Sequence, residues 1–564
     1  MKHLFNLLGV MVVVTASLFT ITSCSDDDPA TVSGDPTIAV TTAVNEAAPG
    51  GKLTITVAAT APGTLKSVTV DDVEAKAYTS GSADAFVYDY TIPAVAALGK
   101  KTLTFKVTDA GSKTATTTLD IVVGKEVVVV DKAISASTTW SASKKYLLKS
   151  NIYVQAPAEL TIEAGTIVKG DKVSKGALII NRGAKIHAKG TEANPIIFTS
   201  SAPANFRNYG DWGGLVLLGF ANNNQGTSVK IEGVSTEGSE DGFHGNKDNG
   251  SHEDDNSGEL QYVRVEFAGI ALSTDNELNG LTMGSVGNKT TIDHVQVSYS
   301  GDDSYEWFGG SVNAKYLIAY RGWDDDFDTD NGFSGRVQFG VSHRDPNIAD
   351  KSGSNGFESD NDAAGDALTP ITSAKFSNMT WYGPGVYAAY KAGAINKSNY
   401  NQNFQYGAHI RRNTAVQIYN TVFVGSYLDG INFENANAGA TVQGCYFARM
   451  GVNVSNSVMK TPTGTYDFSY FAGANEIEAT QNTVDLTSRI VKLGVTANDK
   501  KENLANIDSP LSLLAAGSGL LNNTHLLDLT ANGFDATTYI GAFDATNDWT
   551  SKSWVNFKPN ATDY

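Results

Sequence analysis

The stretches LQYVRVEFAG (260–269), IDHVQVSYSG (292–301) and AKYLIAYRG (314–322) decide the fold of this chain, because each is a short β-strand pattern closed by a glycine. Similar runs follow downstream, and their closing glycines are Gly383, Gly425 and Gly451. Short strands that recur in this way, with no helical pattern between them, are typical of a parallel β-helix. We therefore expect residues 127–564 to form an all-β, right-handed parallel β-helix with a C-terminal cap.

Residues 37–124 show a different pattern, in which strands alternate apolar and polar residues. Their turns recur about every 8 to 12 residues, the spacing of a small antiparallel sandwich. The last strand pair, TFKVTDAGSKTATTTLDIVV (104–123), resembles bacterial immunoglobulin-like modules. This resemblance implies an immunoglobulin-like β-sandwich, which we interpret as a spacer because it contains no cluster of chemistry-bearing residues.

The N-terminal residues 1–23 have the features of an export signal. An apolar run from Leu4 to Phe19, short for a membrane span, leads through small residues to Cys24. This ending resembles a bacterial lipobox, and the acidic residues 25–28 resemble the surface-export tag of Bacteroidota lipoproteins. The resemblance implies an acylated Cys24, a lipid anchor in the outer membrane, exposure at the cell surface and an acidic tether over residues 24–36. The alternative is an ordinary signal peptide with an incidental cysteine.

The composition narrows the classes of partner. The chain has 42 basic and 60 acidic residues, a formal charge of −18, which argues against nucleic acid. Its two cysteines, Cys24 and Cys445, exclude a disulfide framework if Cys24 is acylated. Strong acidity with 55 glycines instead indicates a loop-rich, cation-binding β protein.

An acidic motif repeats within the β-helix, in the stretches GDDSYEWFGG (301–310), DDDFDTDNG (324–332) and SNGFESDND (354–362). Their alignment stacks one aromatic column, Tyr305, Phe327 and Phe357, and one acidic column, Glu306, Asp328 and Glu358. Strand alternation places the aromatic rings on one face and the carboxylates on the other. Coils are about 4.8 Å apart, so like charges in one column repel each other. Nothing basic in these three segments except Arg321, just before the second of them, is a candidate to offset that charge.

A calcium ion fits this acidic column, because calcium takes six to eight hard oxygen ligands in irregular geometry. The predicted ligands are Asp302, Glu306, Asp324, Asp326, Asp328, Asp330, Glu358 and Asp360. Zinc fits poorly, because the histidines are scattered without ligand spacing. We predict a structural calcium site that joins adjacent coils; the alternatives are a solvated acidic ridge and a catalytic ion.

Several longer runs, among them GDWGGLVLLG (210–219), ELQYVRVEFAG (259–269) and SGSNGFESDND (352–362), resemble a family of Bacteroidota β-helix surface lipoproteins that mostly have no assigned activity. The C-terminal YIGAF (539–543) is similar to the same family's ending. The resemblance implies a location and a fold. It does not imply a mechanism.

An enzyme is the alternative function, a calcium-dependent polysaccharide lyase or a glycoside hydrolase that acts on acidic glycans. TIDHVQVSYSGDD (291–303) resembles a coil of pectate lyases, and its GDD resembles the aspartate pair of polygalacturonases. Inverting hydrolysis needs two carboxyl groups about 6.5 to 9.5 Å apart. The candidate catalytic residues are Asp302, Asp303, Asp324, Asp325 and Arg321. Other motifs of both families are missing.

Binding is the function that we favour from the sequence. Aromatic faces beside polar groups recognise sugars, and Trp323, Trp381 and Tyr382 are the predicted ligand-binding residues, whereas Trp307 fits the core. We expect an accessory binding or scaffold component that captures a glycan or peptide, or serves in adhesion. An outer-membrane transporter or another surface lipoprotein is the expected partner.

Overall fold

The computed structural model describes residues 34–234, 240–248, 250–273, 276–386, 401–425, 430–448, 459–460, 475–477 and 517–564. The chain divides into two compact units, Met1–Lys125 and Glu126–Tyr564. The signal sequence, Cys24 and most of the tether lie outside the described residues. Among the residues described, no helix is long and apolar enough to cross a membrane.

The first unit is a sandwich of two sheets. One sheet is antiparallel and contains β1 (Thr37–Thr42), β3 (Lys52–Thr60) and β6 (Ala83–Thr91). The other contains β2 (Glu46–Ala47), β8 (Thr114–Val123), β7 (Gly99–Asp109), β4 (Leu65–Val70) and β5 (Val73–Ala77). Alternate residues of β3 are buried, so the period of two in the sequence produces the apolar face of the sandwich.

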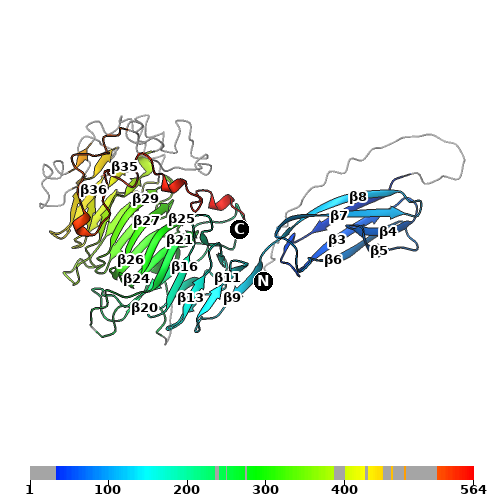
Figure 1. The fold of residues 1–564 in the computed structure, drawn as a ribbon, viewed down its shortest axis with the longest axis horizontal. Coiled ribbons are helices and arrows are strands. Elements are labelled where there is room, and N and C mark those ends of the chain that lie inside the picture. The colour runs from blue at the N-terminus through cyan, green and yellow to red at the C-terminus, as the bar shows by residue number, and fades with distance from the viewer. Residues whose placement is uncertain are drawn as a thin grey trace, which may run out of the picture. The chain divides into compact units, whose positions relative to one another are not determined.

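The second unit is a parallel β-helix, as the sequence predicts, and Figure 1 shows its strands side by side in successive coils. Among the described residues, one face is a parallel sheet of ten strands. These strands are β12 (Ile152–Val154), β15 (Ala177–Ile180), β18 (Gly214–Leu218), β24 (Leu281–Val286), β26 (Tyr305–Gly310), β28 (Phe327–Asp330), β30 (Phe357–Ser359), β33 (Ala408–Arg411), β36 (Ile431–Glu434) and β39 (Met459–Lys460).

The described strands on the remaining faces belong to one continuous 18-stranded sheet. The first coils contribute β9 (Glu126–Val130), β10 (Thr138–Trp140), β11 (Lys144–Leu148), β13 (Glu159–Ile162), β14 (Ile167–Gly170), β16 (Lys185–Lys189) and β17 (Ile196–Ser200). The middle coils contribute β21 (Gly258–Glu266), β25 (Thr291–Ser298), β27 (Asn313–Tyr320) and β29 (Arg336–His343). The last coils contribute β31 (Lys375–Ser377), β32 (Thr380–Tyr382), β34 (Gln417–Tyr419), β35 (Val422–Val424), β37 (Thr441–Gln443), β38 (Tyr446–Ala448) and β40 (Glu476–Ile477).

Each of the four middle strands turns a corner at one residue in the left-handed region. These residues are Tyr262, His294, Tyr316 and Phe339, with φ between 50° and 64°. A left-handed backbone is costly for an aromatic side chain. Ring stacking between neighbouring coils offsets this cost, with centroid separations of 4.5, 4.3 and 5.0 Å along the column.

Residues 517–564 are not an end cap. Their 3-10 turns η5 (Thr530–Asn532), η6 (Trp549–Ser551) and η7 (Pro559–Ala561) lie along the side of the coils, so the chain runs back across β29, β27, β25 and β21 (Figure 1). We call residues 517–564 the strap. Its aromatic residues cover the corner column, because Trp549 contacts Tyr316 and Trp554 contacts His294. Residues 517–564 therefore form a lateral cover of the coils.

Two excursions leave the coils on the side of the ten-stranded sheet. The first carries β19 (Val229–Lys230) and β20 (Phe243–His244), and the second is the hairpin β22 (Ile270–Ser273) and β23 (Asn276–Leu278). We expect a mobile loop at 233–258 from its polar sequence. The described part of this loop instead packs on the coils, because Arg182 donates hydrogen bonds to the carbonyl of Gly245 and the carboxylate of Glu240. A further 3-10 turn, η1 (Pro384–Val386), follows β32.

Candidate metal centre

The predicted register of the acidic repeat is confirmed. β26, β28 and β30 pair in parallel, with Tyr305 opposite Phe327, Phe327 opposite Phe357, Glu306 opposite Asp328 and Asp328 opposite Glu358. The aromatic rings stack in the core at 5.6 and 5.3 Å between centroids. Since side chains alternate along a strand, the carboxylates of these three strands project from the outer face.

The outward carboxylates line a cavity of about 270 Å³. Its walls hold ten carboxylates and two cationic side chains, a formal charge of −8 when all are ionised. The acidic residues are Glu232, Glu277, Asp302, Asp303, Glu306, Asp324, Asp325, Asp328, Asp350 and Glu358, and the basic residues are Lys351 and Arg411. The cavity therefore favours a cation over an anionic ligand.

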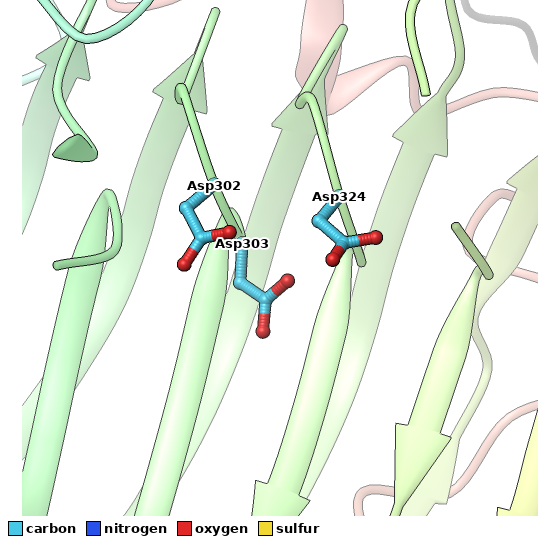
Figure 2. A group of neighbouring side chains, drawn as sticks. All are labelled: Asp302, Asp303 and Asp324. Atoms are coloured by element: carbon cyan, nitrogen blue, oxygen red, sulfur yellow. The ribbon is translucent and has the colours of Figure 1, made fainter. Parts of the chain in front are cut away.

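Two groups of three carboxylates in this cavity are close enough to share an ion. The first group is Asp302, Asp303 and Asp324, and the second is Asp303, Glu306 and Asp328. Within each group, one oxygen from every residue lies within 4.8 Å of the others. Figure 2 shows the first group on two neighbouring turns, with the side chains on the same side of the coils.

Few hydrogen bonds satisfy these oxygens. Asp303 accepts one from the backbone N–H of Asp325 at 2.7 Å, and Glu306 accepts one from the side chain of Asn279. No described residue donates a hydrogen bond to the carboxylate of Asp302 or Asp328, and Asp328 Oδ1 is buried. A buried oxygen without a donor is costly unless a cation contacts it.

Burial and like charge raise the pKa of the acids in the cavity. Burial is the larger cause, and neighbouring carboxylates add to it; both hold the pKa of Asp302, Asp303, Glu306, Asp325 and Asp328 well above the usual range. Burial raises the pKa of Asp324 to about 6, although Ser352 and Ser354 donate hydrogen bonds to its carboxylate. At neutral pH these groups are stable as a cluster of anions only with compensating positive charge.

Glu358 and Asp360 have the compensating charge that the other acids lack. Arg411 forms ion pairs with both, and Arg412 bonds Asp360 at 2.7 Å. His409 Nδ1 lies 3.6 Å from Glu358. The prediction that only Arg321 is a candidate to offset the column is therefore wrong, because the neighbouring strand β33 supplies the cations. Asp360 does not line the cavity.

Asp326 and Asp330, two predicted metal ligands, also lie outside the cavity. Asp326 is fully buried inside the coil, where it forms an ion pair with Arg344 at 3.0 Å and accepts a hydrogen bond from Trp381. Asp330 lines a separate cavity of about 300 Å³, and burial raises its pKa to about 7. The acidic run DDDFDTD thus divides between core, main cavity and neighbouring cavity.

The other predicted residues are also dispersed. Arg321 is buried under Tyr299 and 3.8 Å from Asp345, and it does not line the acidic cavity. Trp381 and Tyr382 are 2% and 1% exposed, so neither offers a ring face to a ligand, which corrects the prediction of a binding role. Trp323 is partly exposed and contacts Tyr209 edge to face. Trp307 is in the core.

Sequence reasoning missed the walls that the excursions build. Glu232 follows β19, Glu277 lies on β23 and Asn279 follows that hairpin, yet all contribute to the acidic cavity or its hydrogen bonds. Asp350 and Lys351 come from the loop between β29 and β30. In the sequence, only the acidic column indicates the metal centre. The two excursions contain no repeat from which their position over the cavity could be predicted.

The fold and the site together define a class of protein: a parallel β-helix with a buried acidic centre on its ten-stranded face. Residues 132–497 match the family described as Pectate-lyase like beta helix domain, and the chain belongs to this family. A comparison with curated proteins gives no match. One similar solved structure is titled "Catalytic domain of GH87 alpha-1,3-glucanase in complex with nigerose", at 10% identity and a TM-score of 0.19, over 80% of this chain and 95% of that chain.

Proposed function

We propose that the protein is a calcium-binding β-helix lipoprotein of the outer cell surface. It serves as an accessory binding or scaffold component that captures a glycan or peptide beside a transporter or another surface lipoprotein. The observation that supports the proposal is the pair of carboxylate triads. Within each triad, one oxygen of every residue lies within 4.8 Å of the others. These carboxylates have no ion-pair partner among the described residues.

Calcium is the cation that suits these donors. All ligand atoms of the triads are carboxylate oxygens, and none is a nitrogen or sulfur atom of the kind that zinc prefers. Magnesium requires near-ideal octahedral geometry, whereas calcium accepts irregular sets of six to eight oxygens. Carboxylates that come from turns and strands of different coils match calcium better.

The spacing of the same carboxylates favours an ion over hydrolysis by a carboxyl pair. Asp302 and Asp324 approach within 4.8 Å. An inverting hydrolase keeps its carboxyl groups about 6.5 to 9.5 Å apart, and a retaining one about 5 to 5.5 Å. The nearest oxygens of Asp302 and Asp324 are thus closer than the separation of either pair of groups, and close enough to contact one ion.

Calcium should raise the thermal stability of the protein. A ligand at about 100 times its dissociation constant adds about 2.7 kcal/mol to the free energy of unfolding. We expect a higher melting temperature in millimolar calcium than in chelator, and a smaller difference for Asp328→Asn. Asp254→Asn is the matched control, because Asp254 is exposed and pairs with Lys289. Identical melting curves of the unsubstituted protein in chelator and in calcium contradict the proposal.

The effect of chelation should grow with pH. The pKa of Asp324 is raised to about 6 in the folded protein, above about 3.9 in the unfolded chain. Without calcium, its contribution to stability is complete below pH 4 and is lost as the pH rises through 6. The melting difference between calcium and chelator should therefore be larger at pH 7.5 than at pH 4.5.

A calcium-dependent lyase or hydrolase is the second candidate. It is favoured by Arg411 and Lys351, which place cationic side chains on the wall of the acidic cavity. If this candidate is correct, incubation with uronate polymers and calcium releases an unsaturated product that absorbs in the ultraviolet, or new reducing ends. We expect neither, and glycan binding without turnover. Either product overturns the accessory role.

Anchoring at the membrane is tested through the N-terminal cysteine. We expect Cys24→Ser to abolish acylation and release the protein into the soluble fraction, because the lipid that anchors the chain at this residue is then missing. The measurement is fractionation with a metabolically incorporated fatty acid. Cys445→Ser is the control, since Cys445 is buried in the core. Membrane retention of the Cys24→Ser protein contradicts the lipid anchor.

A further inference from the structure

Asp303 belongs to both carboxylate triads of the cavity. It lies on the turn before β26, with Asp302 and Asp324 on one side and the strand residues Glu306 and Asp328 on the other. Its side chain is 7% exposed. One oxygen, Oδ1, accepts the N–H of Asp325 at 2.7 Å, and no described residue donates a hydrogen bond to Oδ2. Asp303 thus has one oxygen without a donor that is available to an ion.

We propose that the cavity binds two divalent cations and that the Asp303 carboxylate bridges them. The inference rests on the proposed calcium site and concerns its composition. One ion, at the turn site, contacts Asp302, Asp303 and Asp324. The other, at the strand site, contacts Asp303, Glu306 and Asp328.

The charge of the five ligands requires more than one ion. Five carboxylates carry a formal charge of −5, so one divalent cation leaves −3 and two leave −1. Of the two cations on the cavity wall, Arg411 is engaged by Glu358 and Asp360, and Lys351 forms no ion pair with the five ligands among the described residues. Buried like charges of this density persist only with a compensating charge close to them.

The geometry also separates the ligands into two sets. Calcium holds oxygens at about 2.3 to 2.6 Å, so oxygens on one ion lie within about 5 Å of each other. The described residues meet that condition as two groups of three, each within 4.8 Å, and not as one group of five. Asp328 Oδ1, buried without a donor, points to an ion at the strand site.

Calcium titration by isothermal calorimetry tests the inference on the whole mature chain. We expect two ions per chain, one ion for Asp302→Asn, one ion for Glu306→Gln, and at least a tenfold loss of affinity at both sites for Asp303→Asn. Asp254→Asn should keep two ions. Circular dichroism in chelator establishes that each variant is folded before titration.

Lanthanide luminescence supplies an independent readout of the bridge. Two ions that share one carboxylate lie about 4 Å apart, so a mixture of terbium and europium should show energy transfer in the unsubstituted protein and none in Asp302→Asn or Glu306→Gln. One ion in the unsubstituted protein, or loss of only one ion in Asp303→Asn, overturns the bridged pair while the calcium proposal stands. No calcium binding at all overturns the proposed function itself.

Discussion

Replacing Arg344 by leucine should lower the free energy of unfolding of the β-helix by about 3 to 5 kcal/mol, the usual cost of breaking a buried ion pair. Arg344 and Asp326 are both fully buried and 3.0 Å apart. The guanidinium also donates to the carbonyl of Asp324 and lies 5.1 Å from the ring of Phe404. Leucine leaves the Asp326 carboxylate in the core without its cation.

Tryptophan fluorescence during urea unfolding measures this effect in the β-helix alone, because all seven tryptophans follow residue 126. Adding Asp326→Leu to Arg344→Leu should recover part of the loss, since the uncompensated charge is then gone. Lys289→Met, which breaks an exposed ion pair, should cost less than about 1 kcal/mol. If Arg344→Leu costs no more than Lys289→Met, the buried pair is not a stabilising feature of the coil.

The same residues show which features of the site can be predicted from the sequence and which cannot. The register of the acidic repeat is predictable, because a period of two and a repeat of one coil fix which residues stack. Asp326 is not predictable in this way, since it precedes the strand and its partner Arg344 follows the next strand of the coil. Alternation applies within a strand and does not extend through a turn.

Compensating charge is equally hard to predict from a repeat. Arg411 and Arg412 are more than fifty residues from Glu358, at the end of a strand that the acidic motif does not include and just after it. Glu232 and Glu277 reach the cavity through excursions that have no counterpart in other coils. The sequence therefore predicts the acidic column but not which of its carboxylates are paired with cations. The carboxylates without such a pair define the metal centre.

The strap is a second feature that pattern reasoning cannot place, because the polar contacts that hold its backbone are irregular in sequence. Four side-chain amides from different coils bond to its backbone: Gln296 to Asn556, Gln338 to Asp535, Asn378 to Tyr539 and Asn420 to Leu527. A primary amide both donates and accepts, so it can bond a chain segment as another strand would. Gln296, Gln338 and Asn420 bond in both directions. These amides fix the strap over the aromatic corner column.

Trp554→Ala should lower the free energy of unfolding of the β-helix by about 3 to 5 kcal/mol, the usual cost of removing a buried tryptophan. The Trp554 side chain is 1% exposed and meets Tyr262 and His294 edge to face at 6.0 and 5.4 Å. Its loss removes the ring that covers two left-handed corner residues. Lys552→Ala, an exposed change on the same strap, should stay within about 0.5 kcal/mol.

Limited proteolysis separates loosening of the strap from damage to the coils. We expect Trp554→Ala to expose cleavage sites within residues 517–564 at protease concentrations that leave the unsubstituted protein intact, because the weakened strap detaches before the coils open. Cleavage that begins instead in the strands, or a free energy of unfolding equal to that of Lys552→Ala, contradicts the strap as a stabilising cover. Since these amides bond the strap backbone, and only Asn378 among them also bonds a strap side chain, that of Thr537, the apolar contacts of Trp554 are the part of this cover that a substitution in the strap can remove.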